Sequence, residues 1–127
     1  MLCRFINQPG VQIRPHDFGG LKGISSLDPA RPKYSATYLP LVKALEAVGY
    51  VDRVNLWGAP YDWRFAADGL EKQGVADEMQ ALIEMAVSTA GGRPVVVIAH
   101  SMVLPFPHAQ GSVLNGSCSL TMLHAHV

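Results

Sequence analysis

The sequence predicts an α/β fold built on a parallel sheet, because helical and strand-like segments alternate along the chain. Two segments carry apolar residues at helical spacing, and each is followed by a short apolar segment. Parallel neighbours need crossovers of about a dozen residues or more, usually helical, so strand–helix–strand–helix–strand order fits an open sheet covered by helices. With 127 residues the chain has room for one domain, but it is short for a complete α/β enzyme.

Three short segments are predicted to be strands. Residues 11–14 alternate apolar and polar and enter a loop rich in glycine and proline that continues to Ser35. Residues 54–57 form a brief second strand, closed by Gly58 and the nearby proline. Residues 95–98 are continuously apolar and β-branched, which is typical of a strand buried on both faces.

Two segments are predicted to be amphipathic helices. From Tyr38 to Val48, apolar residues recur every three or four positions, with a proline tolerable in the first turn and Gly49 at the stop. From Val75 to about Thr89, apolar residues share one face, and the acidic residues lie mainly on the flanks and the opposite side. These two helices are the predicted crossovers of the sheet.

Charge and composition exclude several classes of protein. Lys and Arg total 10 and so do Asp and Glu, which leaves no basic field for nucleic acid. The two cysteines show no metal-binding or disulfide pattern. No apolar run reaches the roughly 18 residues that span a bilayer, and the first residues lack the apolar core of a signal peptide, so the compartment stays open.

The charge distribution divides the chain. All 20 charged residues precede Ser101, and residues 103–127 contain none. A typical domain is about 25% charged, so several charges would be expected there. Residues 103–127 are therefore interpreted as an atypical, uncharged tail that is distinct from residues 1–102.

Ser101 directly follows the last predicted strand, where a serine hydrolase carries its nucleophile. A nucleophile elbow is a strained turn between strand and helix that needs small residues two before and two after the serine. Ala99 meets the first requirement and Val103 fails the second. The local pattern leaves two interpretations open: Ser101 is a nucleophile, or it simply ends a strand. His100 is poorly placed to activate it, because adjacent strand residues point to opposite faces.

Three blocks of sequence are distinctive in combination. They read P-G-V-Q-I-R at 9–14, G-A-P-Y-D-W-R at 58–64 and P-V-V-V-I-A-H-S-M at 94–102, with D-F-G-G at 17–20 after the first. Together they resemble the lecithin:cholesterol acyltransferase family, including its lysosomal phospholipase relatives. The resemblance implies a partial α/β-hydrolase domain over residues 1–102. It also implies an enzyme that moves a fatty acyl group from a phospholipid to an acceptor alcohol or water, at a membrane or lipid surface.

The resemblance also implies roles for individual residues. Ser101 would be the nucleophile that forms an acyl-enzyme, and the backbone N–H of Met102 would be one oxyanion donor. Tyr61 and Trp63 would line the acyl pocket in one interpretation. In the other, which is preferred, their charged neighbours pin the loop while Trp63 packs. No metal or organic cofactor is expected.

The pattern breaks after the nucleophile. Serine acyl transfer needs a histidine base and a carboxylate, yet no Asp or Glu follows Ser101. Three histidines do follow, without a strand pattern to present them: His108, His124 and His126. Pro105 and Pro107 oppose the helix that should cap the nucleophile.

We therefore expect a truncated form that ends just after the nucleophile, with residues 103–127 outside the family. The earlier strand and the loop that supplies the second oxyanion N–H are also expected to be missing. Two alternatives are a catalytically silent fragment that binds lipid or a partner, and a different serine hydrolase.

Overall fold

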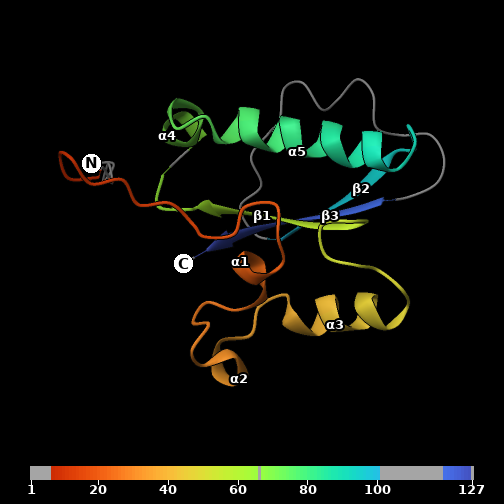
Figure 1. Cartoon of the computed structure of the whole chain (residues 1–127). Helices are drawn as coiled ribbons and strands as arrows, with labels where there is room; N and C mark the ends of the chain where they lie inside the picture. Colours follow the sequence, from red (N-terminus) through yellow and green to blue (C-terminus); the bar gives the residue numbers. More distant parts are fainter. Residues whose placement is uncertain (1–6, 66, 101–118, 127) are drawn as a thin grey trace.

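The computed structural model covers the whole chain and describes residues 7–65, 67–100 and 119–126 (Figure 1). The helices and strands follow one another as α1 Lys22–Ser25, α2 Pro32–Ser35, α3 Leu39–Ala47, β1 Leu56–Asp62, α4 Ala67–Lys72, α5 Val75–Thr89, β2 Val95–His100 and β3 Ser119–His126. The three strands form one parallel sheet in the order β1-β3-β2. Helices α4 and α5 lie on one side of the sheet, and α1 and α3 lie on the other, with α2 farther out. This arrangement agrees with the predicted α/β class.

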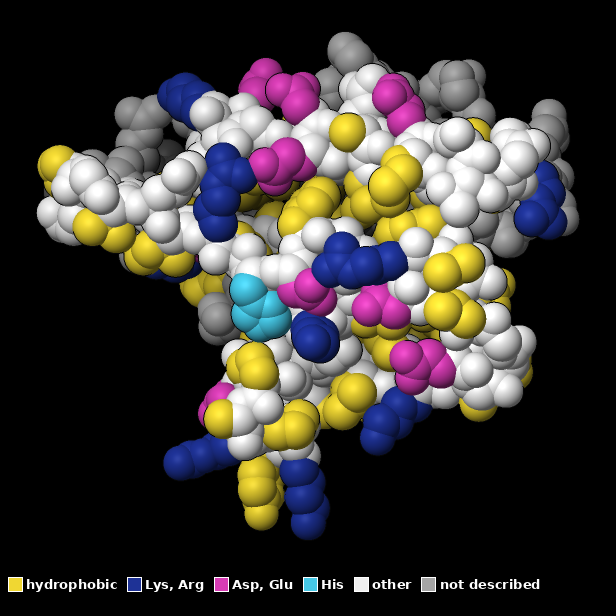
Figure 2. Space-filling model, viewed as in Figure 1, with side chains coloured by type: hydrophobic (Ala, Val, Ile, Leu, Met, Phe, Trp, Pro, Cys, Tyr) yellow, Lys and Arg dark blue, Asp and Glu magenta, His cyan; other side chains and the backbone are white. Residues whose placement is uncertain are grey.

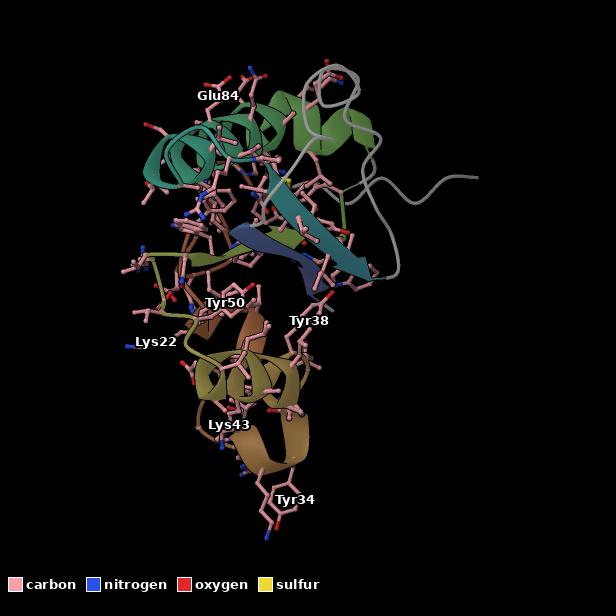
Figure 3. The ribbon with its side chains drawn as sticks, turned by 90° about the vertical axis from the view of Figure 1, so that its right-hand side faces the viewer. Lys22, Tyr34, Tyr38, Lys43, Tyr50 and Glu84 are labelled. Atoms are coloured by element: carbon pink, nitrogen blue, oxygen red, sulfur yellow. The ribbon has the colours of Figure 1, made fainter. Side chains whose placement is uncertain are left out.

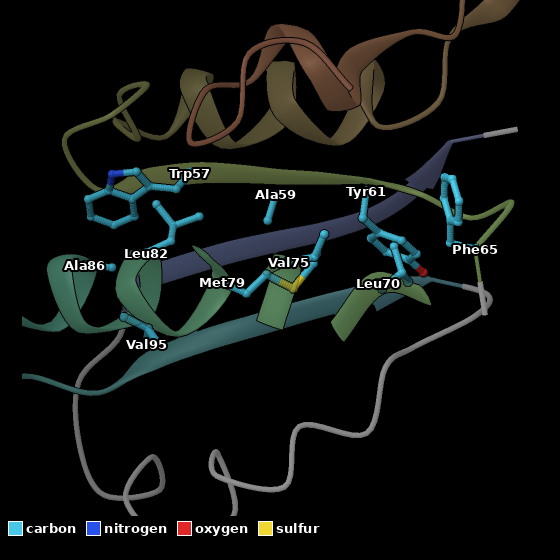
Figure 4. Packing of buried hydrophobic residues seen from close by; sticks show 10 residues of the cluster. All are labelled: Trp57, Ala59, Tyr61, Phe65, Leu70, Val75, Met79, Leu82, Ala86 and Val95. Carbon is cyan, nitrogen blue, oxygen red and sulfur yellow. The ribbon is translucent and has the colours of Figure 1, made fainter. Parts of the chain in front are cut away.

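Strand β1 joins the two helical layers, because its residues alternate between the two faces of the sheet. Trp57, Ala59 and Tyr61 belong to the hydrophobic cluster formed with α4 and α5, which Figure 4 shows at close range. Leu56 belongs instead to the cluster formed with α1 and α3. The sheet therefore has a hydrophobic cluster on each side.

Both predicted helices are confirmed. Helix α3 starts one residue after the predicted start and ends one residue before Val48. Helix α5 has the predicted bounds, and its buried residues are Val75, Met79, Leu82 and Ala86, at intervals of four, three and four. This spacing turns one face of α5 toward the sheet (Figure 4). Helices α1, α2 and α4 were not predicted, and each is only four to six residues long.

The first predicted strand is wrong. Residues 11–14 have no regular structure and lie at the surface. No strand pairs with them in the described part of the chain, so this alternating segment forms no ladder of backbone hydrogen bonds there. Arg14 instead extends to α5, where its Nη1 lies 2.5 Å from Oε1 of Glu78.

The second predicted strand is real but displaced. It begins at Leu56 and runs through Gly58 and Pro60 to Asp62, so the G-A-P-Y-D segment is mostly strand and not loop. Pro60 cannot donate a ladder hydrogen bond, but β1 lies at an edge of the sheet, which is where strands accept proline.

Strand β2 is confirmed, but the expectation that both of its faces are buried is wrong. Val95 is buried in the cluster under α5, whereas Val96 and Val97 are exposed. The reason is that the helical layers cover little of β2: only Val95 belongs to the cluster under α5, and only Ile98 packs against the cluster formed with α1 and α3.

The central strand comes from the uncharged C-terminal tail. Strand β3 pairs in parallel with β1 over seven residues and with β2 over six. His124 and His126 therefore lie on a strand, which corrects the expectation that nothing presents them. His108 lies outside the described residues. That the tail lies outside the family stays a prediction.

Two methionines on α5 test the packing of this layer. Met79 is 1% exposed in the cluster, and Met85 is 46% exposed on the same helix. We expect Met79→Ala to lower the free energy of unfolding by about 2–5 kcal/mol, because it leaves a cavity. The matched Met85→Ala change should cost well under about 1 kcal/mol. Urea denaturation measures both, and equal losses would contradict the packing described.

Candidate functional site

The carboxyl ends of the three parallel strands meet at one edge of the sheet. In the register, Pro60 on β1 and His100 on β2 are both paired with His124 on β3. Strand β2 ends there, directly before Ser101. Strand β1 continues two residues farther, to Asp62. Sites in open α/β sheets lie in the crevice at this edge, so the position of Ser101 in the chain fits a nucleophile.

The two residues expected to carry the chemistry, Ser101 and Met102, lie outside the described residues. Their roles therefore stay predictions. The structure does describe the neighbouring end of β1, where Tyr61 and Trp63 lie, and two clefts that share Asp62 in their walls.

The first cleft has a volume of about 500 Å³ and lies between the D-F-G-G loop, the end of β1 and α5. Its apolar wall includes Phe18, Leu82 and Met85, and Tyr61 also lines it. Tyr61 is only 3% exposed, and burial raises the pKa of its hydroxyl. Tyr61 is therefore mainly a core residue that reaches the cleft wall.

The second cleft has a volume of about 420 Å³ and is lined by Ile13, Leu27, Pro29 and Trp63, among others. Trp63 is 38% exposed, so it packs in part and leaves the rest of its surface to solvent. The physical reason is that β1 ends at Asp62, so Trp63 lies outside the strand whose residues are all buried. That Trp63 binds substrate stays a prediction.

Asp62 and Arg64 hold the turn that carries Trp63. Arg64 Nε donates to Asp62 Oδ1 at 2.8 Å and to Oδ2 at 3.0 Å, and a terminal guanidinium nitrogen also donates to Oδ2. The backbone N–H of Arg64 donates to Oδ1 at 3.1 Å. The side-chain hydrogen bond from Arg64 lowers the pKa of Asp62, although burial opposes this shift. This agrees with the structural role proposed for the pair from sequence.

The D-F-G-G loop is fixed against the middle of β1. Gly19 N–H donates to Gly58 O at 2.8 Å. A Cβ on Gly58 would lie 2.5 Å from the carbonyl oxygen of Gly20, so the approach requires glycine. Asp17 and Arg53, both in the left-handed region at φ 61° and 59°, form an ion pair beside the loop. Sequence reasoning missed Arg53, because its partner is 36 positions away and no local motif marks it.

Two further classes of feature are absent from the described ranges. Within residues 7–65, 67–100 and 119–126, no group of three or more His, Cys, Asp or Glu side chains is arranged to hold a metal ion. None of the described helices combines the length and the apolarity needed to cross a bilayer.

Comparison with known proteins decides the family. The model of a family described as lecithin:cholesterol acyltransferase matches residues 4–105, which is most of the chain. The chain belongs to the lecithin:cholesterol acyltransferase family. Membership implies the α/β-hydrolase fold, and it confirms the resemblance noted in the three sequence blocks.

Individual relatives agree with the family match. Lecithin-cholesterol acyltransferase-like 1 of Arabidopsis thaliana is 39% identical over 103 residues, which cover 76% of this chain and 24% of the relative. Lysosomal phospholipase A and acyltransferase of Rattus norvegicus is 36% identical over 93 residues, covering 73% and 22%. Phospholipid:diacylglycerol acyltransferase 1 of Arabidopsis thaliana is 31% identical over 105 residues, covering 81% and 15%. The chain thus spans a quarter or less of these relatives, and no solved structure matches it significantly.

The pair at the end of β1 gives a pH-dependent prediction. The folded pKa of Asp62 lies below its ordinary value of 3.8, so its ionised form stabilises the fold above that pH. This stabilisation is lost as the pH falls through the folded pKa. We expect Asp62→Asn to cost about 1–2 kcal/mol near neutral pH, where the partial exposure of Arg64 weakens the pair.

The measurement is chemical denaturation of the parent and variant over a pH series. The difference between them should shrink as the pH falls below 3.8. Glu46→Gln, at an exposed carboxylate on α3, serves as the control and should show no such trend. A difference of constant size at every pH would show that Asp62 acts through packing and not through its charge.

Proposed function

We propose that Ser101 is the nucleophile of a lipid acyltransferase or phospholipase. In this proposal an acyl group passes from a phospholipid to Ser101, and then to an acceptor alcohol or to water. The observation that carries it is the family match, which extends over Ser101 and Met102. The position of Ser101 directly after β2, at the carboxyl edge of a parallel sheet, supports the same role.

The first half-reaction needs four groups. Ser101 Oγ attacks the ester carbonyl and forms a new C–O bond, a base takes its proton, and the glycerol oxygen leaves with a proton. The backbone N–H of Met102 and a second donor stabilise the oxyanion. The apolar walls of the two clefts, with Trp63 in one of them, suit the hydrocarbon of the acyl chain.

The base and the carboxylate that orients it are the groups for which the 127-residue chain offers the fewest candidates. His124 and His126 lie on β3 at this edge, and Asp62 is the register partner of His126. However, Arg64 occupies both carboxylate oxygens of Asp62, which leaves it poorly suited to orient an imidazole. Glu78, which lines the first cleft with Asp62, is paired with Arg14, and no Asp or Glu follows Ser101. We therefore propose that this chain alone does not complete the triad.

A fluorophosphonate probe tests the nucleophile. We expect the 127-residue chain to label no more than its Ser101→Ala variant, because Ser101 lacks an activated base. A longer version that includes the family's acid and base should label at Ser101 and lose the label in Ser101→Ala. Ser88→Ala, at an exposed serine of α5, is the matched control and should change neither result. A longer version that labels equally with and without Ser101 would refute the assignment.

A lipid-binding module without turnover is the second candidate function. It is favoured by the partly exposed Trp63 in a cleft with an apolar wall, which needs no triad to bind an acyl chain. The partners in this proposal remain phospholipid and, for the active form, an acyl-acceptor alcohol.

Fluorescence of Trp63 tests whether the second cleft binds lipid chains. The sequence has two tryptophans, and the buried indole N–H of Trp57 has no partner among the described residues, so Trp57→Phe breaks no hydrogen bond. In that background, Trp63 is the only reporter. A long-chain fatty acid, or a lysophospholipid below its micelle concentration, should shift the emission to shorter wavelength, because the ligand excludes water from the indole. Ile13→Asp, in the same cleft, should weaken the shift, whereas Val48→Asp should not. An unshifted spectrum would contradict a role of Trp63 in substrate binding.

A further inference from the structure

Residues 26–36 form an ordered protrusion that carries α2 away from the sheet, with Tyr34 at its far end (Figure 3). Its neck is closed by an antiparallel bridge between Ser26 and Ala36. Ser35 fastens the interior, because its hydroxyl donates toward the carbonyls of Asp28 and Arg31 and accepts from the N–H of Asp28, each at 3.0 Å.

Beyond Ser26 at its neck, the protrusion has no buried side chain. All residues from 27 to 34 are exposed, and Tyr34 is 85% exposed, the highest value among the exposed large hydrophobic residues. The shape is therefore held by its own hydrogen bonds while its apolar side chains face outward. Such an arrangement is pre-organised for an external partner, since binding would not have to order it.

The charged residues near the protrusion indicate which kind of partner it would bind. From Leu21 to Ala47 the bases are Lys22, Arg31, Lys33 and Lys43, against two acids, Asp28 and Glu46. On the opposite layer, α5 carries three acids and no base. In Figure 2, basic side chains extend from the lower end of the molecule, and several acidic side chains lie at its top with basic ones beside them. The segment that carries the protrusion thus has an excess of bases, whereas α5 has an excess of acids.

We propose that the protrusion of residues 26–36 docks on a bilayer surface that contains anionic phospholipid. Tyr34 would enter the headgroup region, where an aromatic ring with a polar end is favoured. Arg31 and Lys33 would face the phosphates, and Lys33 Nζ already lies 5.9 Å from the centre of the Tyr34 ring. The acidic face of α5 would point away from the surface, which fixes the orientation of the docked protein.

This inference rests on the proposed lipid function and adds the surface that meets the lipid. Leu27 and Pro29 belong both to the protrusion and to the wall of the second cleft, beside Trp63. Docking at the tip would therefore bring the mouth of that cleft toward the bilayer. The cleft would then lead a lipid chain past Leu27, Pro29 and Trp63 toward the carboxyl edge of the sheet.

Sedimentation with vesicles tests the proposal on the 127-residue chain. We expect binding to phosphatidylcholine vesicles that contain phosphatidylserine, weaker binding to pure phosphatidylcholine, and release by salt, because one aromatic and a few cations bind weakly and electrostatically. Tyr34→Ser and Lys33→Ser should each lower the bound fraction about threefold or more. All changes are at exposed positions, so circular dichroism melting should be unchanged.

Matched controls change the same kinds of group elsewhere. Val48→Ser removes an apolar side chain that is 74% exposed beyond α3, and Lys72→Ser removes a lysine on α4. Both should bind vesicles like the parent. Equal binding by Tyr34→Ser and the parent, no binding to anionic vesicles, or a larger loss in the controls would overturn the proposal. Equally tight binding to heparin, unaffected by Tyr34→Ser, would also overturn it in favour of a generic polyanion site.

The vesicle and labelling experiments distinguish failure of the docking proposal from failure of the proposed acyl chemistry. If vesicle binding fails while a longer version still labels at Ser101, the docking surface is wrong and the acyl chemistry stands. If Ser101 never labels but Tyr34→Ser abolishes vesicle binding, the docking surface stands and the chemistry is wrong.

Discussion

The burial of β1 on both faces is the constraint on which the rest of the structure depends. Every residue from Leu56 to Asp62 is buried, although the strand lies at an edge of the sheet. One face is covered by α4 and α5, and the other by α1 and by the D-F-G-G loop, which approaches closely because residue 58 has no side chain. Two of these covering elements, α5 and the D-F-G-G loop, also form walls of the first cleft. The packing of β1 and the shape of the first cleft therefore depend in part on the same elements.

The second requirement of β1 is a partner for its backbone. Buried N–H and C=O groups must be paired, and among the described strands only β3 offers β1 a ladder. The uncharged composition of the tail, unusual for a surface segment, suits a strand between two others. A segment that looks foreign by composition thus supplies the central strand.

Sequence reasoning succeeded where the signal is local. The periodicity of α3 and α5 is contained within each helix, and the run of β-branched residues marks β2. It failed where the deciding partner is distant: residues 11–14 alternate like a strand but have no neighbour to pair with, and β1 continues through Pro60 because edge position tolerates it. The same holds for the site. The Asp62–Arg64 pair is two residues apart and could be anticipated, whereas Arg53 meets Asp17 across 36 positions and could not. Ser101 was singled out by motif and family resemblance, since local pattern alone left it ambiguous.

The exposed edge of β2 has a consequence for how the protein behaves in solution. Val96 and Val97 are exposed, and among the described strands β2 is paired only through β3. An open edge bearing apolar, β-branched residues is a template for another strand, whether from a longer form of the same chain or from a second molecule. We therefore expect association of the purified chain to begin at β2 and to increase with protein concentration, while its helices stay folded.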